Sequence, residues 1–460
     1  MRKLAILACV SLVAVGGGAR FTSASFTRSL TVGSNSLTVD QLSNYFSVTP
    51  ISSAASGDVN SLSLNFGTVA SARTLTNVFR VTNVSGSTQT AVLALASVPQ
   101  ITSAVFASSG STSATLAAGA SAAVTVTTSS TVCGHGRGTL RLGLSGFGWM
   151  YRTYGVTIDE APEAPGTPTV TQKPAGRLDV AWAASSTTTN LAGYDVYRSA
   201  AGGAYTKLNP SPLIGLTYSD TATADGTSYT YKVQALSTDS PVLTSLFSGT
   251  GTAVADATAP TQPTSAWLAN GGGVGNAYIN GGNASSLSVS VTLASGWRST
   301  DTVTLTLQSG SSTITRTAAA SSGTATFSGI DVSGFGEGAV SISATSTDAA
   351  GNVSGARVAT FVKDTVAPDA PSASYTDSNG GAADKIAGTS EANASISITE
   401  TLPSADSFSG SANASGACSI NVAGVNGTTG HPIAVAYSVR ATDVAGNTSG
   451  ATAVNVNDVK

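Results

Sequence analysis

The chain is poor in the residues on which catalysis and metal binding usually depend. Its 460 residues include only two histidines and three cysteines, and no second Cys/His pair joins Cys133 and His135 to complete a tetrahedral metal site. There is also no Gly-x-Ser-x-Gly elbow, His-Glu-x-x-His motif, phosphate loop or dinucleotide fingerprint. No recognisable catalytic constellation remains, and we predict that the protein is not an enzyme.

Charged and aromatic residues are scarce as well. Only 10% of the residues are charged, 6% are aromatic, and the net charge is −3. No basic patch favours nucleic acid, and no polybasic run favours a membrane surface. Low charge with few apolar residues would indicate disorder, but 41% of the residues are hydrophobic and they alternate with polar ones. A chain of this length is too long to fold around a single hydrophobic core, so we expect about three or four folded domains.

Cysteine is too rare for a disulfide scaffold. Cys9 lies in the N-terminal apolar run, and Cys133 and Cys418 lie far apart in the sequence. Two free thiols or an intermolecular bond are therefore expected in preference to an intrachain disulfide.

The N-terminus has the layout of a secretory signal peptide. Residues 1–3 are positively charged, residues 4–15 are apolar, and small residues follow. Cleavage after Ala19 or after Ala24 satisfies the small-residue rule equally well. The apolar run is shorter than the roughly 18 to 20 residues of a membrane span, and no other stretch qualifies. We therefore predict a secreted chain without a membrane span once the signal is removed.

Three proline-rich tracts, at residues 159–168, 255–264 and 363–372, divide the chain into four segments. Proline fixes φ and stiffens its neighbours, so these tracts are expected to be short, stiff connectors. Between them, runs such as "SLSVSVTL" and "SYTYKVQAL" alternate apolar with polar residues, which is typical of β-strands. The sequence predicts an all-β chain of tandem antiparallel β-sandwiches. The expected parts are a signal peptide at 1–24 and domains at 25–160, 161–256, 257–367 and 368–460.

The second segment can be compared with a known family through "RLDVAWAAS", "YDVYRS" and "DGTSYTYKVQALS". Over its whole length this segment resembles a fibronectin type III domain. The resemblance implies that Trp182 is the core tryptophan of strand B and that Tyr197 lies in strand C. It also implies that Tyr229 is the corner tyrosine, whose hydroxyl bonds to backbone upstream. There is no Arg-Gly-Asp loop.

One octapeptide frame, Asp-x-Ala-Gly-Asn-x-Ser-Gly, occurs twice, as "DAAGNVSG" from Asp348 and "DVAGNTSG" from Asp443. Each copy follows an alternating strand, and with "IAGTSEANASISITE" the two segments resemble bacterial immunoglobulin-like repeats of surface proteins. Gly, Asn and Asp at such a place indicate a turn that closes a hairpin. The first segment, with "LNFGTV" and "FRVTNVSG", resembles camelysin-type biofilm-matrix proteins and immunoglobulin-like surface domains, which implies another β-sandwich.

Calcium is the one ion for which the sequence offers ligands. Linker acids and turn residues could supply oxygen atoms at domain junctions, although no Asp-x-Asp-x-Asp loop is present and Asp is common in turns for local reasons. The sequence leaves open whether the turn aspartates only cap their turns or also hold an ion. The candidates are Asp348, Asn352, Asp364, Asp443 and Asn447, with Asp256 and Asp369 from the linkers.

These observations favour a secreted bacterial cell-surface or extracellular-matrix protein, a modular rod with a structural or adhesive role. Its expected partners are other copies of itself or components of the surface or matrix. A sharper hypothesis is that the strand within residues 25–40 completes a neighbouring subunit's sheet and builds a filament. The alternative is a non-catalytic carbohydrate- or protein-binding accessory protein. It would use exposed aromatics such as Trp149, Trp267 and Trp297, although we expect these to be core residues because large aromatics are usually buried.

Overall fold

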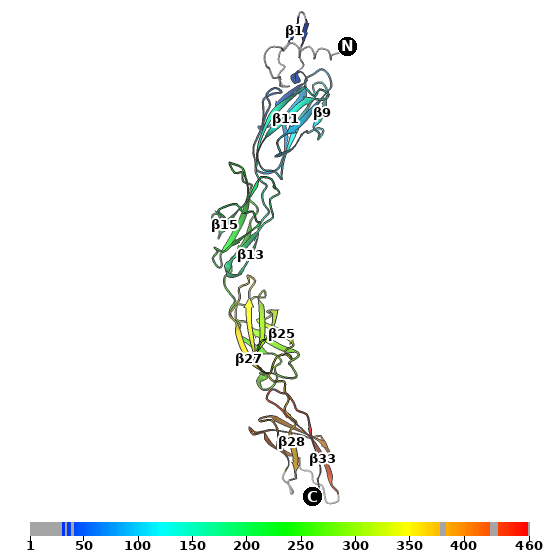
Figure 1. Ribbon diagram of the computed structural model, residues 1–460, viewed down its shortest axis with the longest axis vertical. Helices are drawn as coiled ribbons and strands as arrows, with labels where there is room; N and C mark the ends of the chain where they lie inside the picture. The colour runs from blue at the N-terminus through cyan, green and yellow to red at the C-terminus, as the bar shows by residue number, and fades with distance from the viewer. Residues whose placement is uncertain (1–29, 33–34, 38–40, 378–382, 424–430, 459–460) are drawn as a thin grey trace. The chain divides into compact units, whose positions relative to one another are not determined.

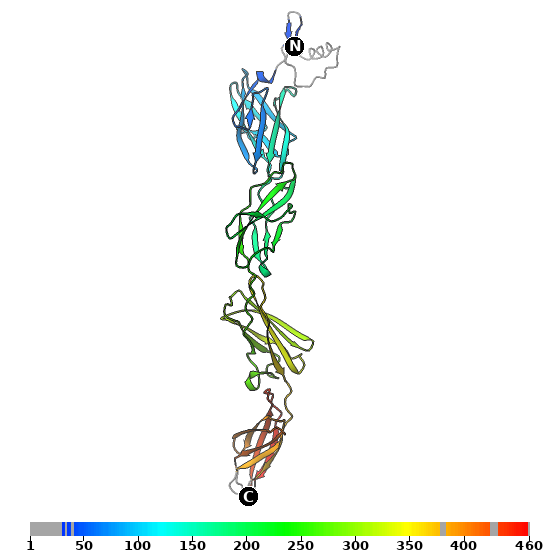
Figure 2. The same cartoon turned by 90° about the vertical axis from the view of Figure 1, so that its left-hand side faces the viewer.

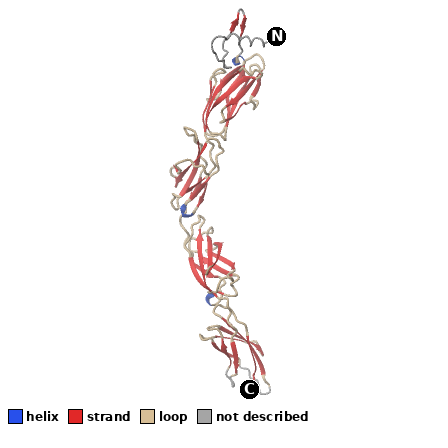
Figure 3. Cartoon of the chain, viewed as in Figure 1, coloured by secondary structure: helices blue, strands red, loops and turns tan. Residues whose placement is uncertain are grey.

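The computed structural model describes residues 30–32, 35–37, 41–377, 383–423 and 431–458. Within these ranges the regular elements are β-strands and three short 3-10 helices, so the all-β prediction is confirmed (Figure 3). None of the described helices is long and apolar enough to cross a membrane. The chain divides into two compact units, one of residues 1–171 and 177–255, the other of residues 172–176 and 256–460. The predicted signal peptide and its two cleavage positions lie outside the described residues.

The first unit contains two β-sandwiches, in which β9 and β11, then β13 and β15, are labelled in Figure 1. One sheet of the first sandwich has the order β3 (Phe46–Pro50), β6 (Thr74–Asn83), β10 (Ser121–Thr128), β8 (Ile101–Phe106). The facing sheet has the order β4 (Ala55–Ser56), β5 (Ser63–Val69), β12 (Tyr151–Glu160), β11 (Gly134–Leu144), β7 (Gln89–Ala96), β9 (Ser113–Leu116). The sheets of the second sandwich are β13 (Thr169–Gln172), β14 (Leu178–Ala181), β17 (Thr217–Asp220), and β16 (Thr206–Lys207), β15 (Leu191–Ala200), β18 (Ser228–Ser237), β19 (Gly251–Val254).

The second unit repeats this plan with two further sandwiches (Figure 2). The sheets of the third sandwich are β20 (Ser265–Leu268), β22 (Leu287–Thr292), β25 (Thr324–Ile330), and β21 (Tyr278–Ile279), β27 (Arg357–Lys363), β26 (Gly338–Thr347), β23 (Thr302–Ser309), β24 (Ser312–Ala319). The sheets of the fourth are β28 (Ser372–Thr376), β29 (Asp384–Thr389), β32 (Ala417–Val422), and β31 (Ser407–Ser411), β30 (Ser395–Leu402), β33 (Ile433–Thr442), β34 (Thr452–Asp458). The 3-10 helices are η1 (Leu42–Asn44), η2 (Pro174–Gly176) and η3 (Val274–Asn276).

Each sandwich has its own apolar core, because alternate residues of facing strands point inward. In β18 every second residue is buried, and the same alternation recurs in β26 and β30. The buried apolar residues form four separate clusters, which extend over residues 42–158, 178–255, 266–344 and 386–454. The alternation read from the sequence therefore marks the faces of the sheets correctly.

The second sandwich contains the residues that the fibronectin type III resemblance singles out. Trp182 follows β14 immediately and is buried, with its ring edge-on to Tyr194 at a centroid distance of 5.8 Å. Tyr229 in β18 is buried, and its hydroxyl accepts a hydrogen bond from the Ala224 N–H at 2.8 Å. Tyr197 lies in β15 and is half-buried, with its ring against that of Phe247. The expected roles of the tryptophan and of the corner tyrosine are confirmed by these contacts.

The two cysteines in the described part of the chain are unpaired. Cys133 and Cys418 are both free and buried. The segment proposed for strand exchange, residues 25–40, is described only at β1 (Leu30–Val32) and β2 (Asn35–Leu37), which pair with each other as a two-stranded sheet.

Candidate functional site at the repeated turn

The first copy of the octapeptide forms a tight turn after β26. The Asp348 N–H donates to the Asn352 carbonyl at 3.1 Å, and the Gly351 N–H donates to the Asp348 carbonyl at 3.1 Å. Gly351 has a φ of +91°, in the left-handed region that favours glycine. Both oxygens of the Asp348 carboxylate accept hydrogen bonds from Asn352, one from its backbone N–H at 2.8 Å and one from its side-chain amide at 2.9 Å. Asp348 therefore caps the turn and also fixes the asparagine side chain.

The second copy repeats every one of these interactions after β33. The Asp443 N–H donates to the Asn447 carbonyl at 3.0 Å, the Gly446 N–H donates to the Asp443 carbonyl at 3.2 Å, and Gly446 has a φ of +91°. The Asp443 carboxylate accepts from the backbone N–H of Asn447 and from its side-chain amide, both at 2.8 Å. Two segments far apart in the sequence thus have the same internal geometry.

The alanine and the serine that both copies share also serve the turn. Ala350 and Ala445 are buried, which leaves no room for a larger side chain at the third position. The serine hydroxyl at the seventh position accepts a hydrogen bond from the preceding strand: Ser354 accepts from the Ser346 N–H and Ser449 from the Ala441 N–H, both at 2.9 Å.

The asparagine of the first turn also reaches beyond it. Its side-chain amide donates to the carbonyl of Asp256, in the linker before the third sandwich, at 3.0 Å. Its side-chain oxygen accepts from the N–H of Ala175, in η2, at 2.9 Å. All three residues belong to the second compact unit, and Asn352 is only 6% exposed. The amide group thus pairs its donor and its acceptor with backbone atoms from two other segments.

The asparagine of the second turn makes the equivalent bonds. The side-chain amide of Asn447 donates to the carbonyl of Asp364, in the linker before the fourth sandwich, at 2.9 Å. Its side-chain oxygen accepts from the N–H of Gly281, which follows β21 of the third sandwich, at 2.9 Å. We call each of these arrangements an asparagine clasp: one turn asparagine, its capping aspartate, a linker carbonyl and a backbone N–H outside the turn. The sequence identified the turns, but it did not identify this second task of the asparagines.

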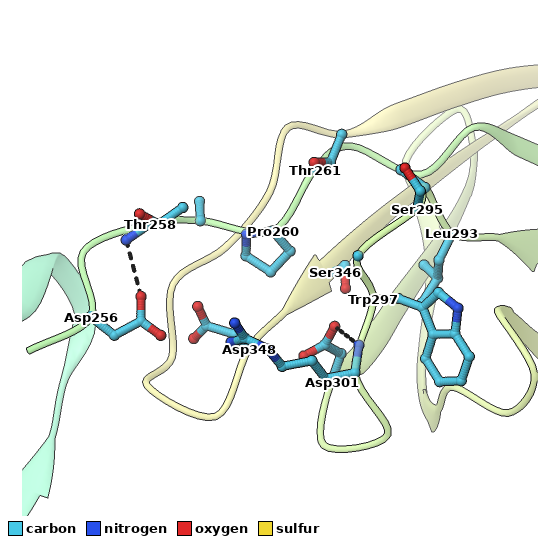
Figure 4. Close-up of a pocket in the computed structure, with 14 residues that line it drawn as sticks. Asp256, Thr258, Pro260, Thr261, Leu293, Ser295, Trp297, Asp301, Ser346 and Asp348 are labelled. Atoms are coloured by element: carbon cyan, nitrogen blue, oxygen red, sulfur yellow. Dashed lines mark hydrogen bonds between the residues drawn. The ribbon is translucent and has the colours of Figure 1, made fainter. Parts of the chain in front are cut away.

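A small cavity of about 180 Å³ lies beside the first clasp (Figure 4). Asp301, next to β23, is 3% exposed; one of its carboxylate oxygens accepts from the Arg298 N–H at 2.8 Å, and the other has no hydrogen-bond partner. The hydroxyl of Ser346, in β26, is also buried without a partner. Both residues line the cavity together with Asp256 and Asp348. Two residues that each carry a buried oxygen without a hydrogen-bond partner therefore line this cavity.

The second clasp lacks these polar groups. The residue directly before each octapeptide has a partner on the neighbouring strand. Thr347 pairs with Thr302 in the first copy, and Thr442 pairs with Ser395 in the second. By this register Ala394 and Ala441 stand where the first copy has Asp301 and Ser346, and both alanines are buried. Sequence reasoning missed Asp301 and Ser346. An alignment of the two repeats on their octapeptides sets Ser346 against Ala441, but it sets Asp301 against Ile396, so the equivalence of Asp301 and Ala394 follows only from the strand register.

The structure brings six of the seven calcium candidates together in two groups. Asp348 and Asn352 lie with the backbone carbonyl of Asp256, and Asp443 and Asn447 lie with the backbone carbonyl of Asp364. Across the described residues no three His, Cys, Asp or Glu side chains are grouped closely enough to hold a metal ion. A cation in the cavity would have to bind to Asp301 and Ser346 and complete its shell from carbonyls and water.

The expectation that the candidate tryptophans are core residues is wrong for two of the three. Trp149, in the loop between β11 and β12, is 56% exposed, and Trp267 is 48% exposed. Trp267 lies in β20 between the buried residues Ala266 and Leu268, so the alternation of the strand turns it to the outer face. Trp297 is half-buried, packs against the core of the third sandwich and lines the cavity (Figure 4).

The fold and the two turns define the class of this chain as a tandem array of β-sandwich domains. No family model matches the sequence. Among curated proteins, Chitinase 63 of Streptomyces plicatus is 36% identical over 80 residues, which are 17% of this chain and 12% of the chitinase. The chain thus spans only a small part of that relative.

Three solved structures are similar to the chain at low identity. The FN1–FN3 domains of chicken CNTN1 are 12% identical with a TM-score of 0.28, covering 65% of this chain and 99% of that one. A Ca²⁺-stabilised adhesin with which an Antarctic bacterium binds ice is 18% identical with a TM-score of 0.28, covering 90% and 98%. A tetra-tandem repeat from the extending region of a large adhesion protein is 16% identical with a TM-score of 0.22, covering 85% and 95%.

Proposed function

We propose that the chain is a secreted bacterial protein of the cell surface or extracellular matrix that acts as a stiff, non-catalytic spacer or adhesin. The observation that carries this proposal is the asparagine clasp at Asn447. It hydrogen-bonds the linker between the third and fourth sandwiches, both in the second unit, and a linker whose backbone is held in this way cannot act as a free hinge. The domains of the spacer are those expected from the sequence, at 25–160, 161–256, 257–367 and 368–460.

Two experiments test this function. The first locates the protein, and the second replaces the asparagines of the clasps. Antibody labelling of intact cells and of the medium should find the protein outside the cell. A strain without the gene should adhere less or form less matrix. The wild-type gene should restore adhesion, and a gene with Asn352→Ala and Asn447→Ala should restore it incompletely. An intracellular protein, or a deletion strain with unchanged adhesion and matrix, would overturn the proposal.

Self-assembly through the N-terminus is the finer form of this proposal. In the described residues, β1 and β2 pair with each other and with no strand of the first sandwich, which supports a segment that is available to another copy. Electron microscopy of native material should show filaments that are absent when residues 25–40 are deleted. Filaments of normal length from the shortened chain would refute strand exchange and leave the spacer function intact.

Calcium binding at the first clasp is a second candidate function, favoured by the unpaired oxygens of Asp301 and Ser346. Arg298 lines the same cavity, and its positive charge opposes a bound cation. If calcium binds there, adding it after treatment with a chelator should raise the melting temperature of the wild type but not that of Asp301→Ala. Equal melting temperatures with and without calcium in the wild type would remove this candidate.

Carbohydrate or protein binding is the alternative class, and the exposure of Trp267 and Trp149 supports it. A glycan array probed with the wild type and with Trp267→Ala tests it directly. Ile214→Ala, at an exposed apolar residue elsewhere, is the matched control. Binding that is lost only in the tryptophan variant would establish the alternative, and no binding in any chain would argue against it.

A further inference from the structure

His135 in the first unit has an acceptor at each of its two ring nitrogens. Its Nδ1 lies 2.6 Å from a carboxylate oxygen of Asp159, the residue opposite it in the antiparallel pair of β11 and β12. Its Nε2 lies 3.1 Å from the carbonyl oxygen of Pro241, in the loop between β18 and β19 of the second sandwich. The ring therefore connects the first sandwich to the second.

This geometry is complete in only one protonation state. A neutral imidazole has a single N–H, so one of its nitrogens would turn a lone pair toward an oxygen lone pair. The imidazolium ion has two N–H groups and donates to both acceptors. The hydrogen bond to Asp159, with a further contribution from the Pro241 carbonyl, raises the pKa of His135 above its ordinary value. The charged form is thus the one that fits the site.

One other titratable group at the same junction, Glu160, responds to pH in the same direction. Glu160, beside Asp159, is buried, one of its oxygens has no hydrogen-bond partner, and burial raises its pKa to about 8. Asp239, in the loop that carries Pro241, also has a buried oxygen without a partner. The Cys133 thiol donates to the carbonyls of Thr189 and Asn190 at 3.4 and 3.3 Å, and burial raises its pKa to about 11, so it stays neutral.

We propose that His135 is a pH-sensitive link between the first and second sandwiches, closed in acid and weakened as the pH rises. The sign follows from the two raised pKa values. For His135 the stabilisation is fully present below its unfolded value of 6.5 and is lost as the pH rises through its folded value. For Glu160 it is present below 4.5 and is lost as the pH rises toward 8. The junction is therefore most stable in mild acid and loosens between about pH 4.5 and 8.

The chain has one other histidine, His431, so the ring signals of His135 can be assigned by substitution of His431. NMR titration of the histidine ring signals of the full chain, assigned with His431→Gln, should show His135 titrating above the ordinary pKa of a histidine. Titration of His135 at the ordinary pKa would overturn the proposal, and this measurement needs no variant of the junction itself.

A second measurement addresses the link. Hydrogen exchange at residues 238–243, corrected for the intrinsic effect of pH, should be slower at pH 5.5 than at pH 8 in the wild type. His135→Gln should reduce this difference, and Asp159→Asn should do the same if the glutamine variant folds poorly. His431→Gln should leave the difference unchanged. A pH dependence that survives both junction variants would show that His135 is not the link.

Discussion

Replacement of Asn447 by alanine tests the asparagine clasp most directly. The change removes three hydrogen bonds of the side chain: those to the Asp364 carbonyl, to the Asp443 carboxylate and from the Gly281 N–H. A hydrogen bond contributes about 1 kcal/mol to stability, and a buried group left without a partner costs about 1 to 3 kcal/mol. Since Asn447 is 8% exposed, we expect the free energy of unfolding to fall by about 3 kcal/mol.

Asn447→Asp separates the hydrogen bonds from the shape of the side chain. Aspartate keeps the volume and can still accept from Gly281, but it cannot donate to the Asp364 carbonyl. It would also place a carboxylate oxygen where the amide nitrogen lies 2.8 Å from the Asp443 carboxylate. Repulsion between the two charges should make this variant at least as unstable as the alanine variant at neutral pH.

The assay combines urea unfolding with hydrogen exchange resolved to single amides. Exchange at the Gly281 amide should accelerate in Asn447→Ala, because that N–H loses its acceptor, whereas Asn447→Asp keeps an oxygen that can accept from it. Asn455→Ala is the matched control, since Asn455 is exposed on β34. If Asn447→Ala is as stable as this control and the exchange of the Gly281 amide is unchanged, the clasp does not join the third sandwich to the fourth.

Three further outcomes are expected. Asn352→Ala should cost about 3 kcal/mol in urea unfolding, for the same reasons as the change at the second clasp, and a loss below about 0.5 kcal/mol would contradict the equivalence of the two. Asp301→Ala, which copies Ala394 of the second clasp, should change stability by less than about 1 kcal/mol in chelator, because removal of a buried unpaired oxygen offsets the lost bond from the Arg298 N–H. Trp182→Ala should cost about 3 to 5 kcal/mol and Trp267→Ala less than about 0.5 kcal/mol by thermal unfolding, because only the first is buried; similar losses would refute this assignment.

The fold was predictable because its signal is local in the sequence. Alternation in runs such as "SYTYKVQAL" specifies both the strand and its buried face, and the octapeptide specifies a turn through Asp, Gly and Asn. The same alternation could have placed Trp267 correctly, because its neighbours Ala266 and Leu268 take the inward positions. The expectation of a buried tryptophan relied on the residue type and ignored its position in the strand.

The clasp was not predictable because the partners of the asparagines are backbone atoms. Every residue has a backbone carbonyl, and every residue except proline has a backbone N–H, so the residue type does not mark a partner of this kind. The partners are the carbonyls of Asp256 and Asp364 and the N–H groups of Ala175 and Gly281. The sequence pointed to the linker aspartates as calcium ligands through their carboxylates, whereas the clasps use their backbone carbonyls. A contact of this kind becomes visible only when the fold brings distant segments together.

The choice of side chain at each junction determines what the junction responds to. The clasps at Asn352 and Asn447 rely on an amide, which carries no proton that titrates and offers one donor and one acceptor group at any pH. The link at His135 relies on a ring that needs a second proton to satisfy both of its acceptors. A shift from mild acid to mild alkali should therefore increase exchange near Pro241 while the amide of Gly281 keeps its protection. Equal loosening at both places would mean that pH acts on the whole fold and not through the histidine.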